Sequence, residues 1–242
     1  MSNKESNHRI IISSPPNGWI GGMFATALIG ALGIFMLGAA VLLTIGGQMG
    51  FGILFAALAG VVGVLFRYVL RDARARRDWR IAVGTDALVL DLPGGRSLVH
   101  RLDPVRTQVC FNQIEAIETR LEAYRSFGMT NMHRSYALKL KTGDLIVLGE
   151  DRALNTGMAS DFFANAIEVI ARHGDLEMRD LGMTEGRGGI LSVLFTSPPR
   201  WDAPDLSTER QAALWRNATW TGRLALLGAV VVLLTALISL VL

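Results

Sequence analysis

No charged side chain occurs between Ile10 and Phe66, and this stretch constrains the chain more than any other feature of its sequence. A run of that length exceeds the ~20 apolar residues that one membrane-spanning helix needs, so we expect two spans. Gly46-Gly47-Gln48-Met49-Gly50 supplies the turn between them. The sequence therefore predicts a first helix over Trp19 to Ile45 and a second over Phe51 to Leu70.

A secretory signal peptide is the competing interpretation of the N-terminal region. Its apolar part is typically ~7–15 residues long and ends at a cleavage site. Here a second apolar span follows at once, which favours an uncleaved anchor. Ahead of the first span, residues 1–18 are short and polar and contain Pro15, Pro16 and Gly18, so we expect a tail there.

Small residues recur at every fourth position in both predicted helices. This spacing lets two helix backbones approach closely in lipid, where no hydrophobic effect drives association. The alternative is that glycine and alanine are simply common in spanning helices. The predicted packing positions are Gly22, Thr26 and Gly30 in the first helix and Gly52, Ala56 and Gly60 in the second. No ionisable group inside the spans marks an ion path, so a transporter or channel is a poor fit.

Arginine is concentrated directly after the second apolar run, in the segment RYVLRDARARRDWR. The turn between the predicted helices carries no charge, so the positive-inside rule places the N-terminus and the region after the second helix in the cytoplasm. A second interpretation is that some of these arginines bind anionic lipid headgroups. The residues concerned are Arg67, Arg71, Arg74, Arg76, Arg77 and Arg80.

From Trp79 onward the apolar pattern changes from that of a membrane helix to that of strands. Ala87 to Leu92 and Ser97 to Leu102 flank the turn Pro93-Gly94-Gly95-Arg96, which predicts a hairpin. A second hairpin is predicted from Tyr136 to Leu148, around Thr142-Gly143-Asp144.

The segment Ile114 to Arg125 fits two patterns. Ile114, Ile117, Leu121 and Tyr124 have helical spacing, but the same residues also fit a long edge strand. We favour a strand, because isolated hairpins need partner strands to cover their apolar faces. An amphipathic helix is then predicted over Ala159 to Arg172, capped by Ser160 or Asp161, and we expect it to cover the sheet.

Antiparallel strands with glycine-containing turns, closed by one C-terminal amphipathic helix and attached directly to membrane helices, resemble the bacterial pleckstrin-homology-like (bPH) domains of small membrane proteins. The residues that carry the resemblance are the hairpin around Pro93-Gly94-Gly95, the segment Gln113 to Glu118, YALKLKTGDLIVLGED from Tyr136 to Asp151, and the helix through Phe162 and Ile170. It covers Trp79 to Leu181. The resemblance implies a platform for binding or assembly and no defined catalytic residues.

The region after Leu181 returns to the membrane. A glycine-rich joint precedes the apolar run Ile190 to Phe195, which rests either on the bilayer or on the domain. A short helix is predicted over Leu206 to Asn217 and a third span over Leu224 to Leu242, which ends in the periplasm. The predicted interface anchors are Trp19, Trp215, Trp220 and Arg223.

The predicted fold class is therefore α+β: a transmembrane helical hairpin, a cytoplasmic antiparallel sheet or partial barrel capped by one helix, and a C-terminal transmembrane helix. The expected division is a tail over 1–18, two spans with a basic end over 19–78, a PH-like domain over 79–181, a linker and interfacial helix over 182–223, and a span over 224–242.

Little in the sequence points to catalysis. Cys110 is the only cysteine, so no intramolecular disulfide forms, and the four scattered histidines supply no metal-ligand spacing. Cys110 is expected to be a small buried hydrophobe, and His133 is expected in a loop. We predict no catalytic residues, no cofactor and no metal, and the arginines lack the aromatic interleaving of a nucleic-acid surface.

The leading hypothesis is a non-enzymatic protein of the bacterial inner membrane that presents its cytoplasmic module to a partner during assembly or regulation of a membrane complex. Its expected partners are membrane lipids and either another membrane protein or a second copy of the chain. One alternative is an anionic-lipid sensor that uses Arg71, Arg74, Arg76 and Arg77 with Ile190 to Phe195. Another is an enzyme with a site around His133 and Glu150.

Overall fold

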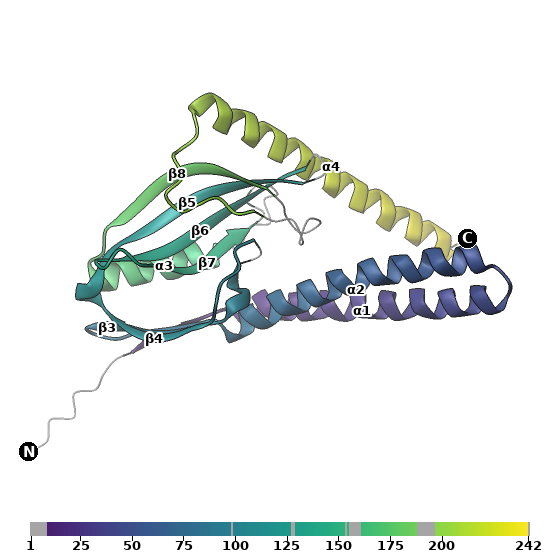
Figure 1. The fold of residues 1–242 in the computed structure, drawn as a ribbon, viewed down its shortest axis with the longest axis horizontal. Coiled ribbons are helices and arrows are strands. Elements are labelled where there is room, and N and C mark those ends of the chain that lie inside the picture. Colours follow the sequence, from purple (N-terminus) through teal and green to yellow (C-terminus); the bar gives the residue numbers. More distant parts are fainter. Residues whose placement is uncertain are drawn as a thin grey trace, which may run out of the picture.

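The computed structural model describes residues 9–97, 99–126, 129–152, 154, 161–187 and 197–241. A long helical hairpin, α1 (Pro16–Ile45) and α2 (Met49–Asp78), extends from one end of a β-rich domain, and a third long helix, α4 (Thr208–Val241), runs obliquely to it (Figure 1). The run Ile190 to Phe195 lies outside the described residues.

Within the described residues, α1 from Trp19 and the whole of α2 are long and apolar enough to cross a membrane, judged by length and composition. Large apolar side chains on both are exposed, including Phe24 (65%), Leu42 (72%) and Ile45 (78%). The core helix of a water-soluble protein would bury such residues, so their exposure favours membrane spans.

The boundaries of the hairpin differ from those predicted. Pro15 and Pro16 start α1 instead of preventing a helix, because the first helical position needs no backbone N–H. Gly47 has φ +79°, a left-handed conformation that glycine adopts without strain, and it makes the turn. The second helix continues past Leu70 to Asp78, so the basic segment is helical.

The two helices pack closely, but with a different repeat on α2 from the one predicted. A Cβ added at Gly22 would lie 3.0 Å from Cβ of Ala73, and one at Gly30 would lie 3.0 Å from the Phe66 ring. Thr26 is buried. Ala56 and Gly60 are exposed. The residues of α2 that are buried or contact α1 are instead seven positions apart, as in left-handed helix pairs. They are Gly52, Ala59, Phe66 and Ala73.

The first sheet has four antiparallel strands in the order β1-β2-β3-β4. These are β1 (Ile10–Ser13), β2 (Arg80–Val83), β3 (Ala87–Leu92) and β4 (Val105–Cys110). Residues 10–13, expected in the tail, thus pair with β2. The predicted hairpin partner of β3 was wrong: the described residues of the predicted strand, Ser97 and Val99 to Leu102, lie in a connection that begins with the 3₁₀ turn η1 (Gly94–Arg96), and β4 pairs with β3 instead.

The second sheet has the order β7-β6-β5-β8. Its strands are β5 (Ile114–Ser126), β6 (Met129–Leu140), β7 (Leu145–Arg152) and β8 (Met178–Arg187), and the turn η2 (Phe111–Gln113) joins β4 to β5. The strand interpretation of Ile114 to Arg125 is confirmed. His133 lies in β6 and not in a loop. The prediction of a wholly antiparallel sheet was wrong, because β8 follows α3 and pairs with β5 in parallel.

The main core draws on both sheets and on α3 (Phe162–Gly174). The N-terminus of α3 is capped from β7: the backbone N–H groups of Phe163 and Ala164 donate to the carboxylate of Asp151, at 3.2 and 2.9 Å. The side chain of Asp161, one of the two predicted caps, makes no capping bond, and the other, Ser160, lies outside the described residues.

A smaller core joins α4 to the second sheet. Leu214 and Ala218 of α4 pack with Leu121, Met132 and Met183. The helix is continuous from Thr208 to Val241, where a short helix and a separate span were predicted. No break occurs because the chain between the two predicted helices contains neither proline nor a turn, only Ala218 to Arg223.

Candidate functional site: a buried polar network where the membrane helix meets the domain

Trp79 is the residue at which α2 ends and the domain begins. Its side chain is 1% exposed, and its indole N–H donates to the Leu148 carbonyl oxygen of β7 at 2.8 Å. The ring meets the rings of Phe162 and Phe163 edge-on, with centroids 5.2 and 5.3 Å away. Such aromatic pairs stabilise beyond their buried area. The last turn of the helix is therefore fixed in the domain core.

The turn η1 makes a second attachment. Gly95 lies so close to α2 that an added Cβ would be 3.1 Å from Cβ of Ala75, so only glycine fits there without displacement. Next to it, the buried Arg96 donates to the carbonyl oxygens of Pro93, Asp103 and Val147. Burial lowers the pKa of Arg96 to about 10, which still leaves it charged at neutral pH.

A chain of buried and partly buried ionic contacts connects α2 to β7. Asp72 of α2 forms an ion pair with Arg152, and Arg152 Nε donates to Glu150 Oε1 at 2.7 Å. Glu150 is 1% exposed, and its Oε2 accepts the hydroxyl proton of Ser97 at 2.5 Å. Burial lowers the pKa of Arg152, but the charges of Glu150 and Asp72 outweigh burial and raise it overall, so the guanidinium stays charged.

A second set of buried polar contacts lies beside the first. Both oxygens of Glu122, a fully buried residue of β5, lie within 3.0 Å of His100 Nε2, and Tyr124 donates its hydroxyl proton to Glu122. Burial raises the pKa of Tyr124, and the neighbouring Glu122 raises it further, so the phenol keeps its proton. Burial lowers the pKa of His100, but hydrogen bonding and the charge of Glu122 raise it more.

The raised pKa of His100 predicts a stability contribution that depends on pH. The contribution is fully present below the unfolded value of about 6.5 and is lost as pH rises through the higher folded pKa. We expect His100→Gln to lower the unfolding midpoint more at pH 5.5 than at pH 8.5. Thermal unfolding at the two pH values measures this, with the exposed His173→Gln as control. A midpoint difference that is the same at both pH values for His100→Gln would contradict the assignment.

His133 and Glu150, the pair considered for an enzyme, do lie together. His133 Nδ1 is 3.6 Å from Glu150 Oε1, which is too long for a hydrogen bond. The Ser97 hydroxyl is occupied, because it donates to Glu150 and accepts from the backbone N–H groups of Val99 and His100. These contacts describe a buried structural network. Within the described residues, no group of three or more His, Cys, Asp or Glu side chains could hold a metal ion.

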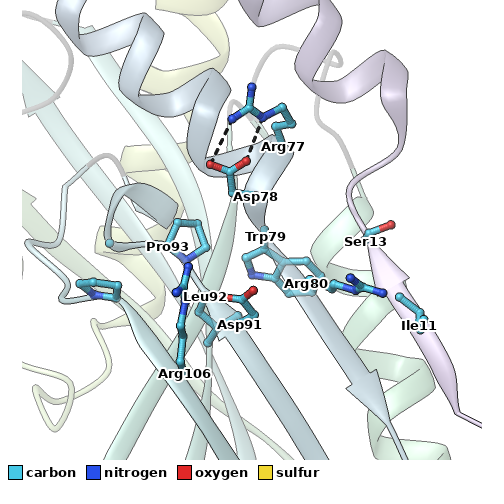
Figure 2. A pocket seen from close by; sticks show the side chains of 12 residues that line it. Ile11, Ser13, Arg77, Asp78, Trp79, Arg80, Asp91, Leu92, Pro93 and Arg106 are labelled. Atoms are coloured by element: carbon cyan, nitrogen blue, oxygen red, sulfur yellow. Dashed lines mark hydrogen bonds and ion pairs between the residues drawn. The ribbon is translucent and has the colours of Figure 1, made fainter.

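A hollow of about 680 Å³ lies on the outer face of the first sheet, next to the end of α2 (Figure 2). Its floor includes one cross-strand row formed by Ser13, Arg80, Asp91 and Arg106, which are register partners on β1 to β4. Arg77 and Asp78, the last residues of α2, line it as well. The hollow is therefore lined by both positively and negatively charged side chains.

The predicted headgroup arginines do not form one surface. Arg71 donates to the Ser97 carbonyl oxygen at 3.4 Å and lies over the Tyr68 ring. Arg76 pairs with Asp72 and Arg77 with Asp78, at 3.2 and 2.8 Å. Arg67 and Arg74 are exposed on α2, and Arg80 is exposed on β2. Among the described residues, Arg71 thus bonds to the domain, whereas Arg76 and Arg77 pair within α2 itself.

The remaining predicted residues are dispersed. Trp215 and Trp220 are 37% and 63% exposed on α4, Arg223 is exposed, and Trp19 is half-buried on α1. Cys110 was expected to be buried and is only partly so, because it ends an edge strand.

Sequence reasoning missed Asp72, Ser97, Glu122 and Arg152. One signal was available: Glu122, Glu150 and Arg152 lie in predicted strands or beside them. Charged side chains at such positions are rarely buried unless they are paired.

No family model, no curated protein and no solved structure matches this chain.

Proposed function

We propose that this chain is a non-enzymatic protein of the bacterial inner membrane whose PH-like cytoplasmic domain is a docking platform for a partner. The partner is another membrane protein or a second copy of the chain, and the setting is assembly or regulation of a membrane complex. Three spans are proposed: α1, α2 and the part of α4 from Leu224. The N-terminus and the domain face the cytoplasm, and the C-terminus faces the periplasm.

The arrangement of the helices supports this topology. The far end of α4 points toward the same end of the molecule as the turn between α1 and α2 (Figure 1). The arginines of α2 lie at the other end, beside the domain, as the positive-inside rule requires for a cytoplasmic domain. The antiparallel run from β2 to β7, followed by α3, supports the PH-like assignment.

One observation supports the proposed docking platform: apolar side chains are exposed on the outer face of a sheet that is fixed to the membrane helix. Ile11 and Val89, both in the row that passes through Ala82, are 53% and 38% exposed. Strand β1 forms an edge of this sheet, and edges accept additional strands. Because Trp79 and the Asp72–Arg152 pair fix α2 in the domain, this face keeps one orientation to the bilayer.

Thiol labelling tests topology and docking together. Val89→Cys is placed in a Cys110→Ser background and exposed to a membrane-impermeant reagent. We expect no labelling of residue 89 in intact cells, slow labelling in opened membranes where the partner covers it, and labelling several-fold faster after purification and dilution. Gln48→Cys, in the turn between the spans, should label in intact cells.

The control is Met178→Cys, at an exposed position of the other sheet (46%), which should label at equal rates in opened membranes and in purified protein. Labelling of residue 89 in intact cells would mean that the topology is inverted. Equal rates for residue 89 in membranes and in dilute purified protein would show that nothing docks on this face.

A further inference from the structure

The hollow beside the end of α2 contains an ordered set of charges. Arg106 Nε is 2.9 Å from Asp91 Oδ1, and Arg77 Nε is 2.8 Å from Asp78 Oδ1. Each carboxylate thus has one arginine. Arg80 lies beside Asp91 in the same cross-strand row and is exposed, and no described residue forms an ion pair with it. The hollow therefore has one cation in excess of its acids.

The spacing of this row sets the size of a complementary group. Neighbouring strands lie roughly 4.8 Å apart, so Arg80, Asp91 and Arg106 present positive, negative and positive charge at that interval. Figure 2 shows Arg80 and Asp91 next to each other on the floor, with Ile11 at the side of Arg80. A ligand that carries an anion and a cation a few ångströms apart matches this pattern, whereas a simple anion would meet two carboxylates.

We propose that the hollow binds the phosphoethanolamine headgroup of a bilayer phospholipid. The phosphate lies on Arg80, because guanidinium groups bind phosphate with paired N–H donors. The primary ammonium lies on Asp91, whose second carboxylate oxygen has no hydrogen-bond partner among the described residues and accepts the N–H groups of the ammonium.

The depth of the hollow relative to the membrane is compatible with a headgroup. If the hydrocarbon core ends near Leu70, the predicted end of the second span, then Arg77 lies seven residues beyond it, or roughly 10 Å at 1.5 Å per residue. The headgroup layer adds ~5–7 Å on each side of the core. Arg77 then lies about 3–5 Å beyond that layer, so the long arginine side chains at the hollow have to extend back toward the bilayer to meet a headgroup, and no acyl chain reaches them.

This site adjoins the docking face used in the proposed function, and Ile11 belongs to both. It uses the charged row through Arg80, whereas docking was placed on the apolar row through Val89. An Arg80 variant is therefore expected to change lipid binding and leave the labelling of residue 89 unchanged. Failure of one proposal can thus be told from failure of the other.

Lipid retention by the full-length protein tests the proposal. The protein is purified in mild detergent and mixed with equal amounts of phosphatidylethanolamine, phosphatidylcholine and phosphatidylglycerol of identical acyl chains, and bound lipid is measured by native mass spectrometry. We expect phosphatidylethanolamine to be enriched roughly threefold or more over the other two lipids, the scale of effect expected from exposed ion pairs. Arg80→Gln should reduce binding of all three, and Asp91→Asn should remove only the preference.

Arg200→Gln is the control, because Arg200 is an exposed arginine outside the hollow that pairs with Asp202. Equal retention of the three lipids by the unaltered protein would overturn the proposal. Enrichment of phosphatidylglycerol that is lost in Arg80→Gln would also overturn it, in favour of a simple anion site. If micromolar soluble phosphoethanolamine displaces the bound lipid, the natural ligand is the soluble compound and the lipid proposal fails.

Discussion

Replacing Trp79 with alanine is expected to lower the free energy of unfolding by about 3–5 kcal/mol, the range for removing a large buried aromatic side chain. The ring is 1% exposed and lies between α2 and the core, against Phe162 and Phe163. Its loss leaves a cavity where α2 is attached to the domain and leaves the Leu148 carbonyl oxygen without its donor. Thermal unfolding of the purified protein, followed by circular dichroism, should show a midpoint roughly 10 °C lower or more.

Two further variants separate packing from hydrogen bonding. Trp79→Phe keeps most of the ring and loses the N–H donor, so its expected cost is nearer 1 kcal/mol. Trp220→Ala removes the same side chain from a position that is 63% exposed on α4, and its midpoint should move little. Equal midpoints for Trp79→Ala and Trp220→Ala would show that Trp79 does not join helix to domain.

The elements that depend on local pattern were predictable from the sequence. The uncharged run before Arg67 identified the helical hairpin, and Thr142-Gly143-Asp144 identified the turn between β6 and β7. Glycine marked the turn after the first span because Gly47 has a left-handed conformation that glycine adopts freely. In each case the physical cause acts over a few residues, so the sequence contains it.

The strand partners could not be predicted in the same way. The segment Val105 to Cys110, VRTQVC, has no clean apolar alternation, since Arg106, Thr107 and Gln108 are all exposed on an edge strand. Pro93-Gly94-Gly95 resembles a hairpin turn, but Gly95 is required by close contact with α2, which is distant in sequence. β8 pairs in parallel with β5 after a helix, and only tertiary packing decides that register.

The candidate network escaped sequence reasoning for the same reason. Arg152 and Asp72 are 80 positions apart, and Glu122 and His100 are 22 apart. Taken singly, each of these side chains is typical of a solvated surface. Only their burial beside one another distinguishes them, and burial is a property of the assembled fold. The arginines of α2 were correctly placed at its end, but Arg71 bonds to the domain and Arg76 pairs with Asp72 of the same helix.

Replacing Arg152 with methionine is expected to destabilise the protein by about 3–5 kcal/mol, because removing one partner of a buried ionic network leaves uncompensated charge. Arg152 is the only link in this chain of contacts that touches both Asp72 of α2 and Glu150 of β7 within the described residues. Its loss removes a guanidinium from Glu150, which is 1% exposed and also contacts Ser97 and His133. The unfolding midpoint is again the measurement.

The matched control is Arg179→Met, because Arg179 pairs with Glu115 and Glu177 at side chains that are 41% and 63% exposed. Exposed pairs contribute about 0–1 kcal/mol, so this variant should unfold close to the unaltered protein. A double variant, Arg152→Met with Glu150→Met, removes the buried carboxylate as well and should recover part of the lost stability. If the double variant is less stable than Arg152→Met alone, uncompensated charge is not the cause.

A double-mutant cycle on Asp72 and Arg152 measures the coupling energy between these two residues. This energy is the strength of the ionic contact between membrane helix and domain.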